Sequence, residues 1–283
     1  MTKLSHNKKY IFGKDRDFID ILQIFLLPLH GMNIEQFVKK QFEQALKRYE
    51  LIEDGDHVLV GLSGGKDSMV LLELLALRSR VFKPKFTVAA AFVKLRNIPY
   101  KNDETYLRDF AESLGVKLHI FDTEFDETTD ERRTHCFLCS WNRRKVLFKA
   151  AQDLGCNKIA LGHHRDDLMQ TALMNLTFEG NFHTMPPRLQ MEKFPVELIR
   201  PLCLLREKEV LTFAKLRGYR QQERKCPYED ASHRSDMKEM ITRFETMNPE
   251  FAFTFYTAME RTFPQQDYKE LNDFKDLKKN KET

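Results

Sequence analysis

Hydrophobic and polar positions in this chain alternate between a helical period and short continuous apolar runs. Apolar residues at helical spacing predict an amphipathic helix over 33–50, with Asn33 as its cap and Gln36 as the capping-box partner. The strands and helices expected after it are, in chain order, 58–62, 68–80, 87–93, 103–114, 116–121, 139–154, 158–161 and 166–177. Strands that alternate with helices predict an α/β fold, an open parallel sheet with helices on both faces.

The pattern is less regular after Gly180. Helices are expected at 207–216, 235–247 and 251–261, so that a domain over 32–262 ends in a helical part. Residues 1–31 are expected to be a dispensable arm, either a disordered segment or a mis-assigned start, because Met32 immediately precedes the capped helix. Residues 263–283 are expected to form a polar tail that frays.

Composition limits the class of protein only broadly. With 42% hydrophobic and 31% charged residues the chain can bury a full core, and its net charge of +4 is compatible with an anionic partner without identifying one. The apolar run 18–29 contains Asp20, Gln23 and Pro28 and is shorter than the roughly 20 residues of a membrane span, so no membrane association is expected. The five cysteines are therefore expected in a reducing cytoplasm, where metal or redox chemistry is favoured over disulfides.

The sequence Ser63-Gly64-Gly65-Lys66-Asp67-Ser68 directly follows the first expected strand. Its two glycines allow a tight turn that presents backbone N–H groups to phosphate, and the helix behind it adds its positive end. Lys66 supplies charge, and Asp67 is a candidate magnesium ligand. An ordinary turn would need only the glycines. A Walker A loop is excluded, because Asp67 stands where that motif has Ser or Thr.

The cysteines divide into two groups by context. Cys136 and Cys139 form a Cys-x-x-Cys pair just before an expected helix, whose N-terminus lowers thiol pKa values. This spacing alone fits zinc, an iron–sulfur cluster or a redox disulfide. Cys226, in a polar loop, is the candidate third thiolate. Cys156 and Cys203 lie among apolar residues and are expected to pack as small hydrophobic side chains.

A third motif, Gly162-His163-His164-Arg165-Asp166-Asp167, follows the strand expected at 158–161. Its histidines and aspartates suggest site chemistry, but the same residues fit a capped helix with Asp166 or Asp167 on the dipole. Ligands of open α/β sheets bind beyond the carboxyl ends of the strands. Since all three motifs follow strands, we expect them to meet at one edge of the sheet.

The loop 63–68 resembles the SGGxDS pyrophosphate loop of the ATP pyrophosphatase, or PP-loop, superfamily, which has an adenine nucleotide alpha hydrolase-like fold. That resemblance implies ATP binding and pyrophosphate release as a substrate oxygen is adenylated. The chain also contains the Cys136-x-x-Cys139 pair, the motif 162–167, Met185-Pro186-Pro187 and Ile199-Arg200-Pro201-Leu202. With all five motifs it is similar to the tRNA 2-thiocytidine synthetases of that superfamily.

The resemblance implies that Cys136, Cys139 and Cys226 ligate three irons of a [4Fe–4S] cluster whose fourth iron is open to hold a sulfide. It also implies ATP and Mg²⁺ at 63–68, with Gly162 and His163 as further cofactor-binding residues. The substrate would be a tRNA cytidine in the anticodon loop, and the sulfur donor a protein such as a cysteine desulfurase. A homodimer is compatible with the sequence.

Catalytic assistance is expected from Asp67, Asp166 and Arg143, which lies one helical turn past Cys139. Arg143 and Arg144 fit equally well as tRNA phosphate contacts or as solvated surface. Two alternatives stay open: another PP-loop ATP pyrophosphatase (a 2-thiouridine, lysidine or amide synthetase), or a non-catalytic tRNA-binding protein with structural zinc. The loop 94–103, which we expect beside the base pocket, is unlike that of the synthetases.

Overall fold

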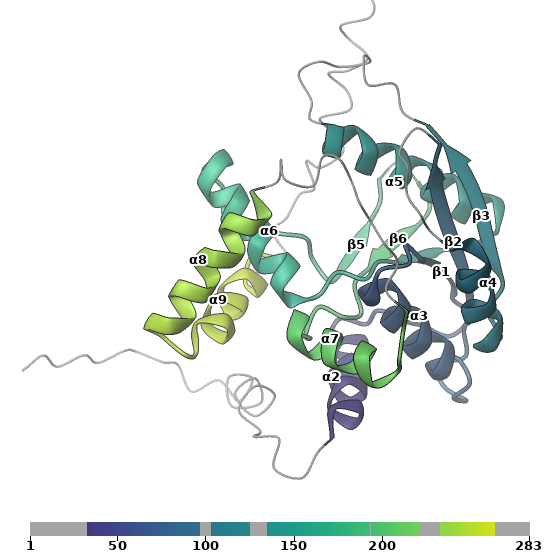
Figure 1. The fold of residues 1–283 in the computed structure, drawn as a ribbon, viewed down its shortest axis with the longest axis horizontal. Coiled ribbons are helices and arrows are strands. Elements are labelled where there is room, and N and C mark those ends of the chain that lie inside the picture. The colour runs from purple at the N-terminus through teal and green to yellow at the C-terminus, as the bar shows by residue number, and fades with distance from the viewer. Residues whose placement is uncertain (1–32, 97–102, 125–134, 193, 221–232, 264–283) are drawn as a thin grey trace, which may run out of the picture. The chain divides into compact units, whose positions relative to one another are not determined.

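The structure is a computed structural model that describes residues 33–96, 103–124, 135–192, 194–220 and 233–263, with only the backbone of 135–137 (Figure 1). Its contacts separate Met1–Asn33 from Ile34–Thr283, and the fold and the site lie in the second unit. The predictions for the arm 1–31, for the tail beyond 263 and for the loop of Cys226 fall outside the described residues.

A six-stranded sheet forms the centre of the second unit, with the strand order β3-β2-β1-β4-β6-β5. All neighbouring strands are parallel except β5, which runs antiparallel to β6. The strands are β1 (His57–Gly61), β2 (Thr87–Leu95), β3 (Leu118–Thr123), β4 (Lys158–Ala160), β5 (Arg188–Gln190) and β6 (Glu197–Ile199). The predicted α/β fold with a mainly parallel sheet is confirmed.

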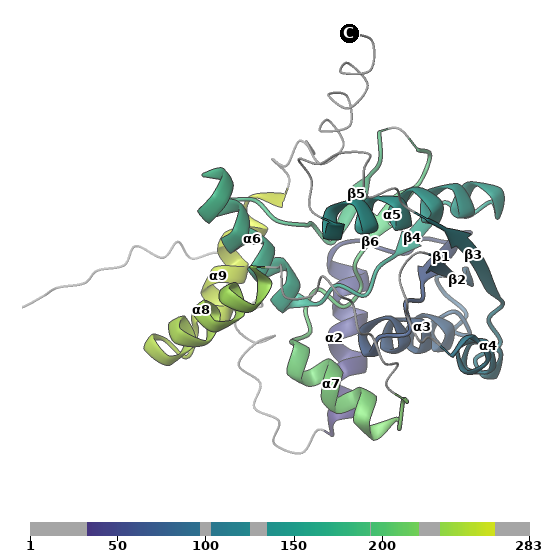
Figure 2. The same ribbon diagram turned by 45° about the horizontal axis from the view of Figure 1, so that its top comes forward.

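Helices follow most of the strands, as the alternating pattern predicts. They are α2 (Ile34–Arg48), α3 (Lys66–Arg78), α4 (Glu104–Ser113), α5 (His135–Asp153), α6 (Arg165–Glu179), α7 (Glu207–Leu216), α8 (Arg234–Met247) and α9 (Phe251–Glu260). Figure 2 shows α5 across one face of the sheet and α3 with α4 across the other. Because helices cover both faces, the central strands are near-continuous apolar runs.

Two features differ from the sequence-based prediction. Strands β5 and β6 were not expected, since three-residue strands are too short to show a period. Helix α5 was expected to start at Cys139 but starts at His135, so the Cys-x-x-Cys pair belongs to its first turn instead of preceding it. Cysteine and phenylalanine are weak helix formers, which hides this turn from a propensity argument.

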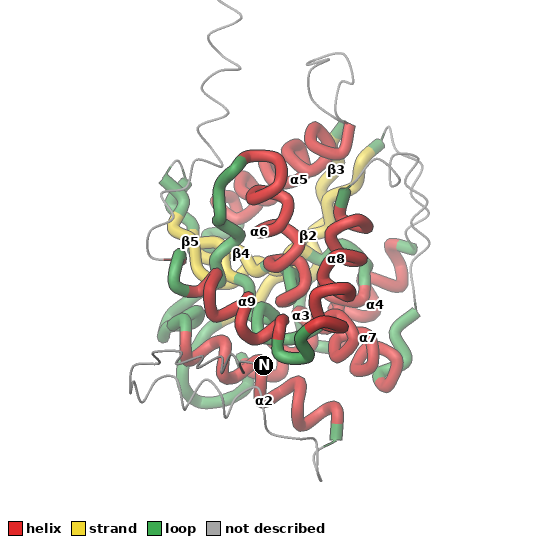
Figure 3. Tube along the Cα trace, turned by 90° about the vertical axis from the view of Figure 1, so that its left-hand side faces the viewer, coloured by secondary structure: helices red, strands yellow, loops and turns green. Residues whose placement is uncertain are grey.

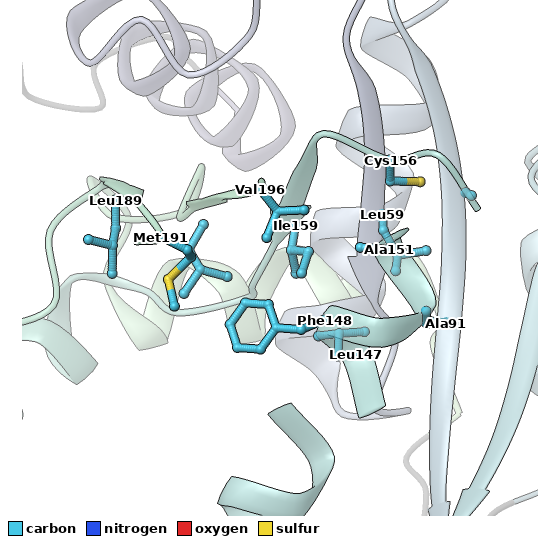
Figure 4. Close-up of a cluster of buried hydrophobic side chains, with 13 residues drawn as sticks. Leu59, Ala91, Leu147, Phe148, Ala151, Cys156, Ile159, Leu189, Met191 and Val196 are labelled. Atoms are coloured by element: carbon cyan, nitrogen blue, oxygen red, sulfur yellow. The ribbon is translucent and has the colours of Figure 1, made fainter. Parts of the chain in front are cut away.

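One buried hydrophobic cluster lies between α5 and the sheet (Figure 4). Leu147 and Phe148 of α5 pack against Leu59 of β1 and Ile159 of β4 within one buried cluster. Cys156 is part of it, and burial raises the pKa of its thiol to about 11. Cys203 is fully enclosed elsewhere, and burial raises its pKa to about 12. The expectation that these two cysteines pack as hydrophobic side chains is confirmed.

The C-terminal helices form a second packed group. Figures 1 and 3 show α8 and α9 lying against α6, and the three helices contact one another pairwise. The end of α2 is attached to α9: Glu260 accepts hydrogen bonds from Arg48 at 2.5 Å and from Tyr49 at 2.6 Å. No helix in the described part of the chain has the length and apolarity needed to cross a membrane.

Candidate active site

The order in which the chain adds strands to the sheet reverses between β1 and β4. From β1 the chain builds outward through β2 to β3, whereas β4 belongs to the half that continues to β6 and β5. β1 and β4 are adjacent and parallel, with Val60 opposite Ala160. Loops 62–65 and 161–164 leave the carboxyl ends of these two strands. They therefore lie at the switch point, where open α/β sheets bind ligands. Two of the three predicted motifs meet there.

The loop after β1 closes on the hydroxyl of Ser68. Ser63 donates to Ser68 Oγ from its backbone N–H and from its own Oγ, each at 3.1 Å, and Ser68 Oγ donates to the Gly65 carbonyl at 2.9 Å. Gly64 has a φ of 78°, in the left-handed region that glycine enters without strain. α3 then begins at Lys66, and its first N–H groups have no partners within the helix. This is the geometry of a phosphate-binding loop.

Gly162 lets the loop after β4 pack directly on that turn. A Cβ atom at this position would lie 3.0 Å from the carbonyl carbon of Asp67 and 3.0 Å from the backbone nitrogen of Ser68. Both neighbours are backbone atoms of α3, so neither can rotate away. The absence of a side chain at Gly162 therefore sets the distance between the two loops.

We expect Gly162→Ala to push the two loops apart. The overpacking should lower the free energy of unfolding by about 1–3 kcal/mol, and ATP affinity should fall about tenfold because the phosphate loop is displaced. Urea unfolding and equilibrium ATP binding measure the two effects. Gly155→Ala is the control: its φ of 66° makes alanine strained, but its Cβ meets nothing within 4 Å. It should lose stability and keep ATP affinity. Unchanged ATP binding by Gly162→Ala would contradict the prediction.

Lys66 is held between two carboxylates. Its Nζ lies 3.2 Å from Asp67 Oδ1 and 3.4 Å from Glu207 Oε1 at the start of α7. Burial lowers the pKa of Lys66, but Asp67 and Glu207 together raise it above its ordinary value, so the ammonium stays charged. Glu207 Oε2 also accepts from Lys238 of α8 at 2.7 Å. A polyphosphate in the loop would compete with Glu207 for Lys66.

Asp67 carries an oxygen suited to a cation. Its Oδ1 is enclosed, and no hydrogen bond reaches it from the described residues. Its polar neighbours are the Lys66 ammonium, with Nζ at 3.2 Å, and the His164 ring, with Nε2 at 3.8 Å. A carboxylate beside a phosphate loop matches the oxygen ligands that Mg²⁺ prefers.

The start of α6 is a capping box. His164 is the N-cap: its Nδ1 accepts from the Asp167 N–H at 3.4 Å, and Asp167 Oδ2 accepts from the His164 N–H at 2.9 Å. Arg234 of α8 lies 3.6 Å from the other oxygen of Asp167. The helix-cap interpretation of the motif is therefore confirmed for Asp167, and His164 joins it.

Asp166 faces α7. Its Oδ1 accepts from Arg206 Nε at 2.8 Å, and its Oδ2 accepts from the Glu207 N–H at 2.7 Å. Arg206 is also paired with Glu245 of α8 at 2.6 Å. Both oxygens of Asp166 thus hold the start of α7. Asp166, which the sequence predicted to be catalytic, instead positions Glu207 beside Lys66.

A cavity of about 170 Å³ lies between the ends of β1 and β2 and helix α5. Its walls are mainly apolar, and Ser63 and Arg143 bring polar groups to it. The residues that line it are Gly61, Leu62, Ser63, Ala91, Phe92, Val93, Arg143, Arg144, Leu147 and Leu161. Arg143, predicted from its distance to Cys139 alone, therefore shares a pocket with the phosphate loop. A flat aromatic group such as adenine fits between such walls.

The predicted cluster ligands are described in part. Cys136 and Cys139 are three residues apart in the first turn of α5, a spacing that places them on one side of the helix, and Cys139 is buried. A Cys-x-x-Cys sequence in a helical turn is compatible with a metal centre. The side chain of Cys136 and all of Cys226 lie outside the described residues. Within those residues, no group of three or more His, Cys, Asp or Glu side chains is placed to hold a metal ion.

His163 sits between the loop of β4 and the end of β6. Its Nδ1 accepts a hydrogen bond from Arg200 Nε at 3.3 Å, and Arg200 also donates to the Pro186 carbonyl at 2.5 Å. Burial and then the nearby cations, Arg200 first among them, hold the pKa of His163 well below its ordinary value. The ring is therefore neutral near pH 7.

Sequence reasoning did not identify the roles of Arg200, Arg206 and Glu207. Arg200 appeared within a motif, but without a partner. The sequence did contain a sign of burial, because Arg200 directly follows an apolar strand, and in the structure it is 2% exposed. For Arg206 and Glu207 the sequence offered only a helix start, because their partners Asp166 and Lys66 are far away along the chain.

These features define a nucleotide-binding α/β protein with a phosphate loop at the switch point of its sheet. The PP-loop domain model matches residues 34–243, so the chain belongs to the PP-loop family.

Within that class it belongs to the family of the tRNA-cytidine(32) 2-sulfurtransferases. It is 32% identical over 254 residues to the protein of that name from Vibrio cholerae serotype O1 (strain M66-2), covering 87% of this chain and 81% of the relative. It is 33% identical over 252 residues to tRNA-cytidine(32) 2-sulfurtransferase 1 from Francisella tularensis subsp. tularensis (strain WY96-3418), covering 87% and 94% of the two chains.

A solved structure is similar over most of the chain. The U34-tRNA thiolase NcsA from Methanococcus maripaludis, determined with its [4Fe-4S] cluster, superposes with a TM-score of 0.68 at 26% sequence identity. The match covers 83% of this chain and 81% of that one.

Proposed function

We propose that this chain is an ATP-dependent tRNA thiolation enzyme that replaces the C2 oxygen of a cytidine by sulfur. The observation that carries the proposal is the course of α5. Its first turn holds Cys136 and Cys139, and its next turn holds Arg143, which lines the same pocket as Ser63 of the phosphate loop. A sulfur-carrying centre and an ATP site would thus be neighbours, as thiolation of an adenylated base requires.

ATP is proposed to bind across the switch point. Its adenine would occupy the cavity beside β1 and β2, and its phosphates would lie over the 63–68 turn, on backbone N–H groups and Lys66. Asp67 would hold Mg²⁺ through its enclosed oxygen. Gly162 keeps the opposite loop close, and His163 lies next to it.

The chemistry proceeds by adenylation and substitution. The C2 oxygen attacks the α-phosphate of ATP, forming a new O–P bond as pyrophosphate leaves. Sulfur then bonds to C2, and AMP departs with the oxygen. Lys66 and Arg143 place positive charge where the phosphates and the adenylate develop negative charge. Asp166 acts through α7, since both of its oxygens hold that helix.

The cysteines fit an iron–sulfur centre. Cys136 and Cys139 supply two thiolates from one helical turn, and Cys226 is proposed as the third. When bound, a [4Fe–4S] cluster would supply the sulfide for C2. The first turn of α5, where Cys139 is buried, would hold it.

The substrate base must leave its stack to reach the site, which favours a single-stranded tRNA loop. We propose an anticodon-loop cytidine, because the relatives at 32–33% identity are tRNA-cytidine(32) 2-sulfurtransferases. The sulfur is proposed to come from a donor protein such as a cysteine desulfurase in a reducing cytoplasm. A homodimer is also proposed, without an assigned interface.

Cells that lack this protein are expected to lose 2-thiocytidine from tRNA and to keep 2-thiouridine. The two bases share the C2 carbonyl, so contacts elsewhere on the ring must separate them, and a site that hydrogen-bonds one base rejects the other strongly. Mass spectrometry of nucleosides from digested tRNA measures both modifications. Complementation with the wild-type gene should restore 2-thiocytidine.

Two other outcomes would redirect the assignment. Unchanged 2-thiocytidine in a deletion strain whose parent makes it would refute the proposal. Loss of 2-thiouridine instead would assign the chain to the activity of its structural neighbour, the U34-tRNA thiolase.

A further inference from the structure

His163 is fixed in one tautomer by a group that can only donate. Arg200 Nε carries a hydrogen and has no lone pair to offer, so the 3.3 Å hydrogen bond makes His163 Nδ1 the acceptor. An imidazole nitrogen that accepts carries no proton. The single proton of the neutral ring is therefore on Nε2.

The arginine that sets this tautomer is itself immobilised. Arg200 is 2% exposed, and its second hydrogen bond, to the Pro186 carbonyl, anchors it to the segment before β5. A buried arginine held at two points cannot turn to release His163 without leaving a buried polar group unpaired. The orientation of the His163 ring is therefore part of the fold.

The ring stays neutral in the range where a free histidine would titrate. Burial disfavours the imidazolium, and Arg200, Arg234, His164 and Arg144 all act in the same direction on its pKa. These neighbours come from separate elements: the end of β6, the start of α8, the cap of α6 and α5. His163 therefore remains a neutral hydrogen-bond donor.

The donor is unpaired and is close to the proposed chemistry. Among the described residues no group accepts a hydrogen bond from His163 Nε2, and the residue is partly exposed. The preceding Gly162 packs on the phosphate loop at Asp67, and Arg144, which lowers the pKa of His163, lines the pocket beside Ser63.

We propose that His163 Nε2–H donates a hydrogen bond to N3 of the target cytosine and thereby excludes uracil. This rests on the proposed function. C2 of cytosine is bonded to two acceptors, the ring nitrogen N3 and the exocyclic O2. Adenylation consumes O2, so N3 is the acceptor that persists. Uracil carries a hydrogen on N3, so it would meet a second donor when it binds, before O2 reacts and that proton leaves. Since Arg200 prevents His163 from switching tautomer, the site cannot adapt to uracil.

A functional-group cycle tests this with cluster-loaded full-length enzyme. Its substrates are tRNAs with cytidine, uridine or 3-deazacytidine at the target position, the last having C–H in place of N3. Replacing cytidine by 3-deazacytidine should lower the kcat/KM of the wild type about tenfold more than it lowers the kcat/KM of His163→Ala. Only the wild type has a hydrogen bond to lose. His163→Gln, whose amide can also accept, should thiolate uridine more readily.

The readouts separate the inference from a role in ATP binding or folding. The 3-deazacytidine penalty is a ratio within each variant, so a change in the ATP affinity of His163→Ala cancels from it. His119→Ala, altered at a half-buried histidine of β3, should behave like wild type throughout. Equal 3-deazacytidine penalties in wild type and His163→Ala would overturn the inference and leave the proposed function intact. So would a loss of ATP affinity with unchanged base discrimination. No thiolation of the cytidine tRNA by wild type would overturn the proposed function, and this inference with it.

Discussion

Replacing Cys136, Cys139 or Cys226 by alanine should abolish assembly of an iron–sulfur cluster, and thiolation should be lost with it. A [4Fe–4S] centre held by three thiolates has no spare protein ligand, so each loss is expected to be complete instead of partial. Anaerobic purification followed by iron and acid-labile sulfide analysis measures the cluster, and 2-thiocytidine formation measures the activity. The wild-type centre should also be sensitive to oxygen.

The two remaining cysteines are the matched controls. Cys156 packs in the core under α5, and the enclosed Cys203 has a thiol pKa raised by burial, so neither is a ready source of thiolate. Cys156→Ala and Cys203→Ala should keep full iron and sulfide content, at some cost in stability. Stoichiometric zinc in strictly anaerobic wild-type protein would contradict the prediction and favour the non-catalytic alternative.

Lys158→Ala should lower the free energy of unfolding by about 3–5 kcal/mol. The side chain of Lys158 is 3% exposed at the amino end of β4, and its Nζ lies 2.9 Å from Asp56 Oδ2 and 3.3 Å from Glu197 Oε2. It also donates to the Leu51 carbonyl at 3.1 Å. Its removal leaves Asp56 without a cation and Glu197 with Arg188 alone, which costs more than the lost packing. Urea unfolding measures the change.

Lys149→Ala provides the comparison for that measurement. Lys149 is exposed on α5, in a helix interior where alanine is favourable, so its removal should change stability by less than about 0.5 kcal/mol. A loss below about 1 kcal/mol in Lys158→Ala would show that the cluster of Asp56, Lys158 and Glu197 does not depend on its cation.

The local patterns of this sequence were enough to predict its architecture. Each long helix shows a helical period of apolar residues, and each long strand is a continuous apolar run. Because strands alternate with helices along the chain, the strands are expected to be parallel. Because parallel strands end at one edge, the positions of Ser63 and Gly162 directly after strands predicted that their loops would be neighbours. The apolar surroundings of Cys156 predicted its burial.

The contacts within the site were decided only by the tertiary structure. Asp166 was expected to assist catalysis, yet its oxygens hold Arg206 and the start of α7, elements about 40 residues away along the chain. Likewise the tautomer of His163 depends on Arg200, which follows a strand too short to show a period. Local patterns record which face of an element is buried. Which polar side chains meet across the switch point depends on how separate elements pack, and no local period encodes that.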